Sequence, residues 1–147
     1  MESEWIKRRF DRYAEKEKSD RLMQQWQSNA VAMYPARFGA LKKQVSDDVQ
    51  FYNQLFAHRD ACKAHFKNDN PDQFLVTCGR GAVEVGKAGA TIISVVYSPE
   101  GSEENVYETL EVAPDPSQNG QIGYRNSTGG FLTEVSASEH ILSRILR

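Results

Sequence analysis

Cysteine and long apolar runs are both scarce in this sequence. The 147 residues include two cysteines, Cys62 and Cys78, which are too few for a disulfide framework and form no C-x-x-C pair. The longest apolar run, from Ala88 to Tyr97, is about ten residues and too short to span a bilayer. The first residues contain no apolar core of the kind found in signal peptides. We therefore expect a cytoplasmic protein with reduced thiols and no membrane contact.

Histidine is also rare, and its positions favour no metal site. His58, His65 and His140 lack the spacing of zinc ligands. A thiol nucleophile with His65 as its base would need the two side chains on one face of a strand. The strand pattern instead places His65 opposite Cys62 and Cys78, so we expect buried cysteines and a surface His140. No catalytic, metal-binding or cofactor-binding residue is predicted.

One stretch comes close to a phosphate-binding loop. Residues 81–88 read G-A-V-E-V-G-K-A, one residue short of the pattern G-x-x-x-x-G-K-[ST]. Ala88 stands where the hydroxyl that binds magnesium is required, and the β-branched sequence that follows favours a strand over a helix. We therefore expect no nucleotide binding, and a turn after Lys87 in which Gly89 has a positive φ.

The first third of the chain has a helical pattern. Residues 2–34 contain neither proline nor glycine, and Glu4–Arg8 and Glu17–Arg21 have the spacing of helical ion pairs. Apolar residues then recur every three or four positions up to residue 56. Pro35 interrupts the pattern, because proline pushes the preceding residue out of the α region. Two helices, packed as an antiparallel hairpin, are predicted.

The period changes to two near residue 62. Alternation on both sides of the turn sequence N-D-N-P-D predicts a β-hairpin about Asn70, in which Phe66 faces Phe74, Ala64 faces Val76 and Cys62 faces Cys78. The alternative extends the second helix through residues 58–68. Five further strands are expected at 82–87, 90–98, 105–112, 121–125 and 131–133, with Asn119-Gly120 as a hairpin turn.

The resulting fold class is α+β. It combines an N-terminal helical hairpin (residues 1–57) with an antiparallel β-meander of about six strands and a C-terminal helix (residues 58–147), in one compact domain. Ser136 and Glu139 have the spacing of a capping box at the start of that last helix.

Charge is divided unevenly along the chain. Residues 1–43 hold ten Lys/Arg and six Asp/Glu, whereas residues 69–147 hold five Lys/Arg and eleven Asp/Glu. The basic end could contact nucleic acid, but the acidic residues among the basic ones weaken its field and argue against that partner. Opposite charge on the two parts suits a contact between two copies of the chain.

These observations favour a non-catalytic interaction or assembly module that forms a homodimer. The alternatives are a small-ligand binder that uses the sheet face under the helices, and an enzyme with an unrecognised Cys/His site. A sheet face filled by apolar side chains would favour the assembly module over both. The expected interaction surface consists of Trp5, Arg8, Arg9, Phe10, Arg12 and Tyr13.

Overall fold

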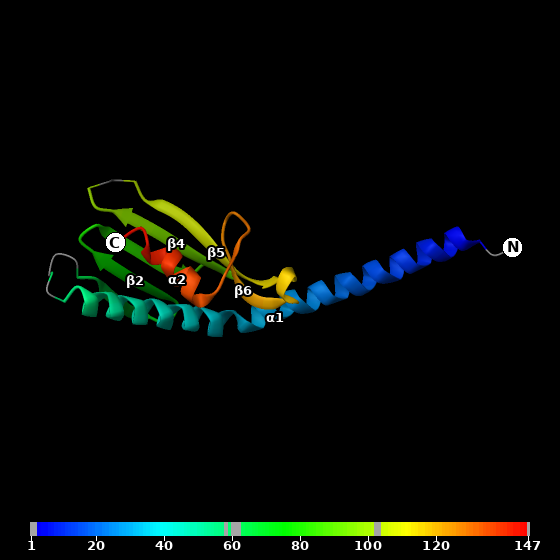
Figure 1. Cartoon of the computed structure of the whole chain (residues 1–147), viewed down its shortest axis with the longest axis horizontal. Coiled ribbons are helices and arrows are strands. Elements are labelled where there is room, and N and C mark those ends of the chain that lie inside the picture. The colour runs from blue at the N-terminus through cyan, green and yellow to red at the C-terminus, as the bar shows by residue number, and fades with distance from the viewer. Residues whose placement is uncertain (1–2, 58, 60–62, 102–103, 147) are drawn as a thin grey trace.

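One long helix precedes an antiparallel sheet and a short final helix (Figure 1). The computed structural model describes residues 3–57, 59, 63–101 and 104–146. Within them lie α1 (Glu4–Leu55), β1 (His65–Asn70), β2 (Gln73–Cys78), β3 (Gly81–Lys87), β4 (Ile92–Pro99), β5 (Val106–Asp115), the 3-10 helix η2 (Pro116–Gln118), β6 (Gln121–Arg125), β7 (Phe131–Leu132) and α2 (Glu134–Leu142). The α+β class is confirmed.

The sheet is a simple meander. Each strand in the described part of the chain pairs antiparallel with the next, in the order β1 to β7. There are seven strands in that part rather than about six. Short connections explain the order, because a short turn brings consecutive strands side by side.

The predicted break at Pro35 is wrong, and α1 runs through it without interruption. Pro35 is exposed, while residues on both sides of it are hydrogen-bonded to the sheet. The Tyr34 hydroxyl donates to the carbonyl of Ile92 at 2.5 Å, and the Tyr124 hydroxyl donates to the carbonyl of Arg37 at 2.5 Å. These contacts compensate for the N–H that proline lacks, and α1 changes direction while it still lies beneath the sheet (Figure 1).

The hairpin of β1 and β2 forms, but its predicted register is wrong by two residues. Phe66 pairs with Val76 instead of Phe74, because the turn is centred on Pro71 and Asp72 rather than on Asn70, and the pairing is irregular between Lys67 and Asn70. The rings of Phe66 and Phe74 still stack diagonally, with centroids 5.5 Å apart. The predicted pairing of Cys62 lies outside the described residues. Of the ambiguous range 58–68, residues 65–68 are strand.

Local turn chemistry was predicted with mixed success. Asn119 and Gly120 both have positive φ, at 54° and 79°, as a tight hairpin turn requires. Gly89 does not adopt the expected positive φ. Thr133, and not Ser136, caps α2: its side chain accepts a hydrogen bond from the backbone N–H of Ser136.

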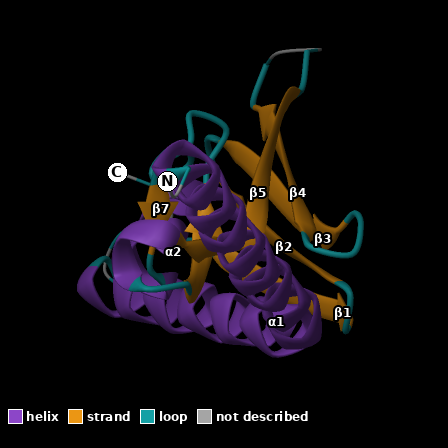
Figure 2. Ribbon diagram, turned by 90° about the vertical axis from the view of Figure 1, so that its right-hand side faces the viewer, coloured by secondary structure: helices purple, strands orange, loops and turns teal. Residues whose placement is uncertain are grey.

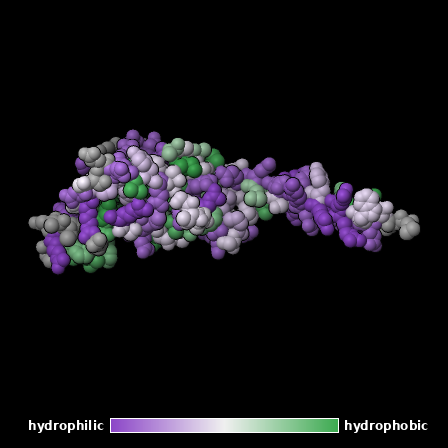
Figure 3. All heavy atoms as spheres, turned by 90° about the horizontal axis from the view of Figure 1, so that it is seen from above, coloured by the Kyte–Doolittle hydropathy of each residue, from purple (hydrophilic) through white to green (hydrophobic). Residues whose placement is uncertain are grey.

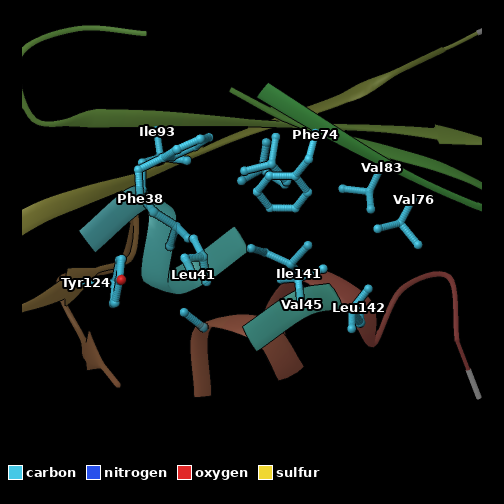
Figure 4. Packing of buried hydrophobic residues seen from close by; sticks show 14 of the residues in the cluster. Phe38, Leu41, Val45, Phe74, Val76, Val83, Ile93, Tyr124, Ile141 and Leu142 are labelled. Atoms are coloured by element: carbon cyan, nitrogen blue, oxygen red, sulfur yellow. The ribbon is translucent and has the colours of Figure 1, made fainter. Parts of the chain in front are cut away.

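Both helices cover the same face of the sheet (Figure 2). Alternate residues of the central strands point toward them and meet the inner half of α1 and the apolar side of α2. The labelled side chains in Figure 4 fill this space from both sides. Phe38, Phe74, Val76, Ile93 and Leu110 are each at most 1% exposed.

Candidate functional site

The first 22 residues of α1 extend beyond the edge of the sheet. We call residues 4–25 the arm; every one of them is exposed. At 1.5 Å per residue the arm is about 33 Å long. Figure 1 shows it projecting beyond the sheet toward the N-terminus. Its ion pairs, Glu4–Arg8 at 3.7 Å and Glu17–Arg21 at 2.8 Å, lie within the helix and match the predicted spacing.

The arm carries all six residues of the expected interaction surface. Trp5, Phe10 and Tyr13 are 59%, 68% and 67% exposed, and the guanidinium of Arg9 lies 5.5 Å from the centre of the Trp5 ring. Figure 3 shows green and pale side chains interrupting the purple near the free end. A soluble helix normally buries its apolar side, so this side of the arm has no partner in the described chain.

Three further exposed apolar residues of the arm were not among the expected site residues. Ile6 lies beside Trp5, and Leu22 and Met23 lie near the base of the arm. The sequence placed Leu22 in one stripe with Ala30, which is fully buried. A continuous stripe does not reveal where the sheet beneath it ends, so sequence alone could not separate the two.

The base of the arm is set by a contact with the β5–β6 turn. Trp26 is the first half-buried residue of α1, and its ring lies directly against Gly120. A Cβ at Gly120 would lie 2.3 Å from the Trp26 ring. Glycine is therefore required here both for close approach and for its positive φ.

The stretch that resembles a phosphate-binding loop forms β3, as predicted, and the chain continues into β4 without a helix. Lys87 at its end has a structural role. Its ammonium lies 3.2 Å from the Asp72 carboxylate and 5.5 Å from the centre of the Phe38 ring.

The structure does not bring Cys78 together with a histidine among the described residues. The Cys78 thiol is half-buried beside the core and donates to the carbonyl of Ile145 at 2.8 Å. His65 lies on the exposed side of β1. His58 and Cys62 lie outside the described residues, so their predicted places stay predictions.

His140 is part of a polar cluster under α2 and is not a plain surface residue. Its Nε2 lies 2.5 Å from a carboxylate oxygen of Glu108 on β5, and Arg144 lies 3.8 Å from the other oxygen. The Arg144 guanidinium also stacks 4.6 Å from the centre of the Tyr97 ring. The Tyr97 hydroxyl donates to the carbonyl of His140 at 3.3 Å. These contacts fasten α2 to the sheet.

Stability should fall at alkaline pH through Tyr97. Burial, aided by the Glu108 carboxylate, raises the pKa of Tyr97 to about 12. In the unfolded chain the hydroxyl ionises at about pH 10, so its stabilising contribution is present below that pH and is lost as the pH rises toward 12. Between pH ~9 and ~12 the free energy of unfolding should therefore fall by about 2 kcal/mol less in Tyr97→Phe than in the wild type. Urea unfolding at both pH values measures this; equal losses in the two proteins would contradict it.

The hollows in the described part of the chain include two of the size of small-molecule sites. The larger, of about 590 Å³, lies between the end of α1 and β1 and is lined by Gln50, Asn53, His65 and Phe66 among others. Asn53 there both donates to and accepts from the backbone of Ala64, at 2.7 and 2.9 Å. Its other polar side chains are largely exposed. Nothing in it points to a ligand, because neither buried polar atom lacking a hydrogen-bond partner in the described chain lies there.

The second hollow, of about 320 Å³, lies where β6, β7 and the start of α2 meet α1. Arg37 lines this hollow, and its Nε is one of the two buried polar atoms that lack a hydrogen-bond partner in the described chain. Arg37 is paired with Glu134 at 2.5 Å, and Asp115 lines the same hollow, so the charges there do not favour an anionic ligand. The part of the chain that the structure describes has no cluster of three or more metal-ligating side chains.

A comparison of the chain with models of known protein families finds no match, and comparisons with curated proteins and with solved structures find none either. Among the described helices, none has a long enough apolar stretch to cross a membrane. Function must therefore be argued from the geometry of the chain itself.

Proposed function

We propose that this chain is a non-catalytic assembly module that associates with a second copy of itself through the arm. The exposure of the arm carries the proposal. In proteins most of the stability of a helix comes from packing its apolar side against another surface. The arm has exposed aromatic residues and no packing partner within the described chain.

The core supports assembly over the ligand-binding alternative. A small molecule bound under the helices would need a cavity there. Phe74, Val76 and Ile93 fill that face and are buried against the helices (Figure 4). Leu110 is buried in the same cluster. These two hollows lie elsewhere. Their charged side chains are exposed or paired with one another, except that of Asp115, which accepts hydrogen bonds from Ser117.

The polar clusters support a non-catalytic role over the enzyme alternative. The Cys78 thiol is engaged with a backbone carbonyl, and His140 is engaged with Glu108. Both contacts join C-terminal residues to the sheet. A general base must instead reach a bound substrate, and neither described hollow contains these two residues.

The arm can be removed without touching the core, which gives a direct test. Deleting residues 1–18 should convert a dimer into a monomer whose sheet remains folded, because every described residue of that segment is exposed. Light scattering measures the mass and circular dichroism the fold. The triple variant Trp5→Ser/Phe10→Ser/Tyr13→Ser should dissociate in the same way.

Phe51→Ser is the matched control. Phe51 is an equally exposed aromatic residue of α1, at 62%, but it lies outside the arm. This variant should remain a dimer. If the full-length chain is monomeric even at high micromolar concentration, self-association through the arm is wrong.

A further inference from the structure

We infer that the arms of two copies pair antiparallel along one side of each helix, about a two-fold axis that passes between Ala14 and Glu15. This inference rests on the proposed self-association and specifies its geometry. Closed two-fold dimers bury the same surface on both subunits, so a single helix face must be complementary to itself.

One face of the arm meets that condition. Spacings of three and four residues place a single row of side chains along a helix. We call the following row the seam: Ile6, Arg9, Tyr13, Lys16, Asp20 and Met23. Each of the six side chains is exposed.

Antiparallel pairing about the proposed axis matches the two ends of the seam. Residues at equal distances from the axis face each other: Ile6 meets Met23 of the second copy, and Arg9 meets Asp20. Tyr13 meets Lys16, which allows the ammonium to lie over the ring. Apolar residues therefore close both ends, and opposite charges lie inside them.

The length of the arm selects the same axis independently. The arm covers residues 4–25, so its midpoint lies between residues 14 and 15. Full overlap of two arms brings each free end to the base of the other arm, where Trp26 packs against Gly120. Overlap is maximal in the register that pairs Arg9 with Asp20.

Charge argues against the parallel arrangement. Residues 4–13 hold four basic and two acidic residues, whereas residues 14–25 hold three of each. Parallel arms would place Arg9 beside Arg9 and Asp20 beside Asp20, and like charges in an interface are costly. Charged residues in a seam weaken a helix pair but fix its register and orientation.

Trp5 and Phe10 lie on opposite sides of the seam. In a coiled coil, the core of each heptad is flanked by the residue before its first core position and by the residue after its second. Here these are Trp5, before Ile6, and Phe10, after Arg9. Both rings are exposed, and Arg9 stacks on Trp5 within the same helix. In the pair, both rings would cover the edges of the seam and shield it from water.

The competing surface for the arm is the sheet face that the helices leave uncovered (Figure 2). Leu75, Glu84, Val96 and Tyr107 form a row across four strands of this face, through the pairing of Glu84 with both Leu75 and Val96 and of Val96 with Tyr107. The order of apolar and charged residues along that row does not complement the order along the seam. The arm-on-arm arrangement is therefore preferred, and sheet docking becomes an outcome of the test.

Cysteine crosslinking distinguishes the arrangements. In a full-length chain with Cys62→Ser and Cys78→Ser, we introduce Ile6→Cys and Met23→Cys together. Two such positions on one helix lie about 25 Å apart and cannot form a disulfide within the chain. Antiparallel arms bring them together between chains, so mild oxidation should give a covalent dimer on a non-reducing gel.

The matched control uses the opposite face of the arm. Asp11→Cys and Lys18→Cys are also equidistant from the axis but point away from the seam, so this pair should not crosslink. Ile6→Cys alone and Met23→Cys alone should also fail, because each cysteine then has its equivalent about 25 Å away. Crosslinking of these single variants would show parallel arms and overturn the inference.

A charge exchange provides a second readout that does not need the apolar ends. Arg9→Asp should weaken dimerisation roughly tenfold, because it places two carboxylates face to face. Adding Asp20→Arg should restore the affinity. If light scattering shows a dimer but neither the crosslink nor the restoration is seen, the arms pack elsewhere, and the seam fails while self-association stands. If the parent chain is never a dimer, the proposed function itself fails.

Discussion

Replacing Phe38 by alanine is expected to lower the free energy of unfolding by about 3–5 kcal/mol. Phe38 is 1% exposed, and its ring lies 5.9 Å from that of Phe74 at a tilted angle. Removing it would leave a cavity between the inner half of α1 and the sheet, which a rigid helix cannot close. Urea unfolding of the full chain at a fixed protein concentration measures the change.

Phe51→Ala is the control for that prediction. Phe51 is on the same helix and has the same side chain, but it is 62% exposed. Its loss should change the free energy of unfolding by no more than about 0.5 kcal/mol. Equal effects of the two substitutions would mean that the inner half of α1 does not pack on the sheet as described.

Phe38 also shows why the helix could not be divided correctly from sequence. The apolar periodicity of the helix was visible in the sequence. The rule that helices end before proline considers only neighbouring residues and takes no account of contacts with the sheet. Tyr34 and Phe38 lie on opposite sides of Pro35 and are both buried on the same surface. Tertiary contacts on each side keep the helix continuous, and those contacts involve strands more than fifty residues away.

The strands were easier to predict than their pairing. Alternation of apolar residues gave β3 to β7 to within a few residues, because turns and β-branched residues mark strand ends. The β1–β2 register failed for a physical reason. A shift of two residues keeps every side chain on the same face, so apolar alternation fits both registers and the position of the turn decides between them.

The arm shows the corresponding limit for the candidate site. Trp5, Phe10 and Tyr13 were predicted to belong to an interaction surface, which stays a prediction; in the structure all three are exposed. Met23 was not identified, because an apolar residue in a stripe gives no sign of whether a sheet lies beneath it. The contact of Trp26 with Gly120 marks that limit, and it exists only in three dimensions.

Replacing Gly81 by alanine is expected to lower the free energy of unfolding by about 3 kcal/mol. Two costs combine at this residue. Its φ is +141°, a conformation that residues with a side chain rarely adopt. A Cβ there would also lie 2.4 Å from the Ser98 carbonyl oxygen and 3.1 Å from the backbone nitrogen of Glu100. Backbone atoms cannot rotate away, so β3 and β4 would have to separate at this end.

Gly129→Ala isolates the first of these costs. Gly129 also has a positive φ, at +88°, but a Cβ there would have no neighbour within 4 Å. Its loss should cost only about 1 kcal/mol, the strain of the backbone conformation. The difference between the two variants in urea unfolding measures the close approach of β3 to β4. If both cost the same, the two strands have room for a methyl group at Gly81, and the end of β3 does not lie against Ser98 as the structure has it.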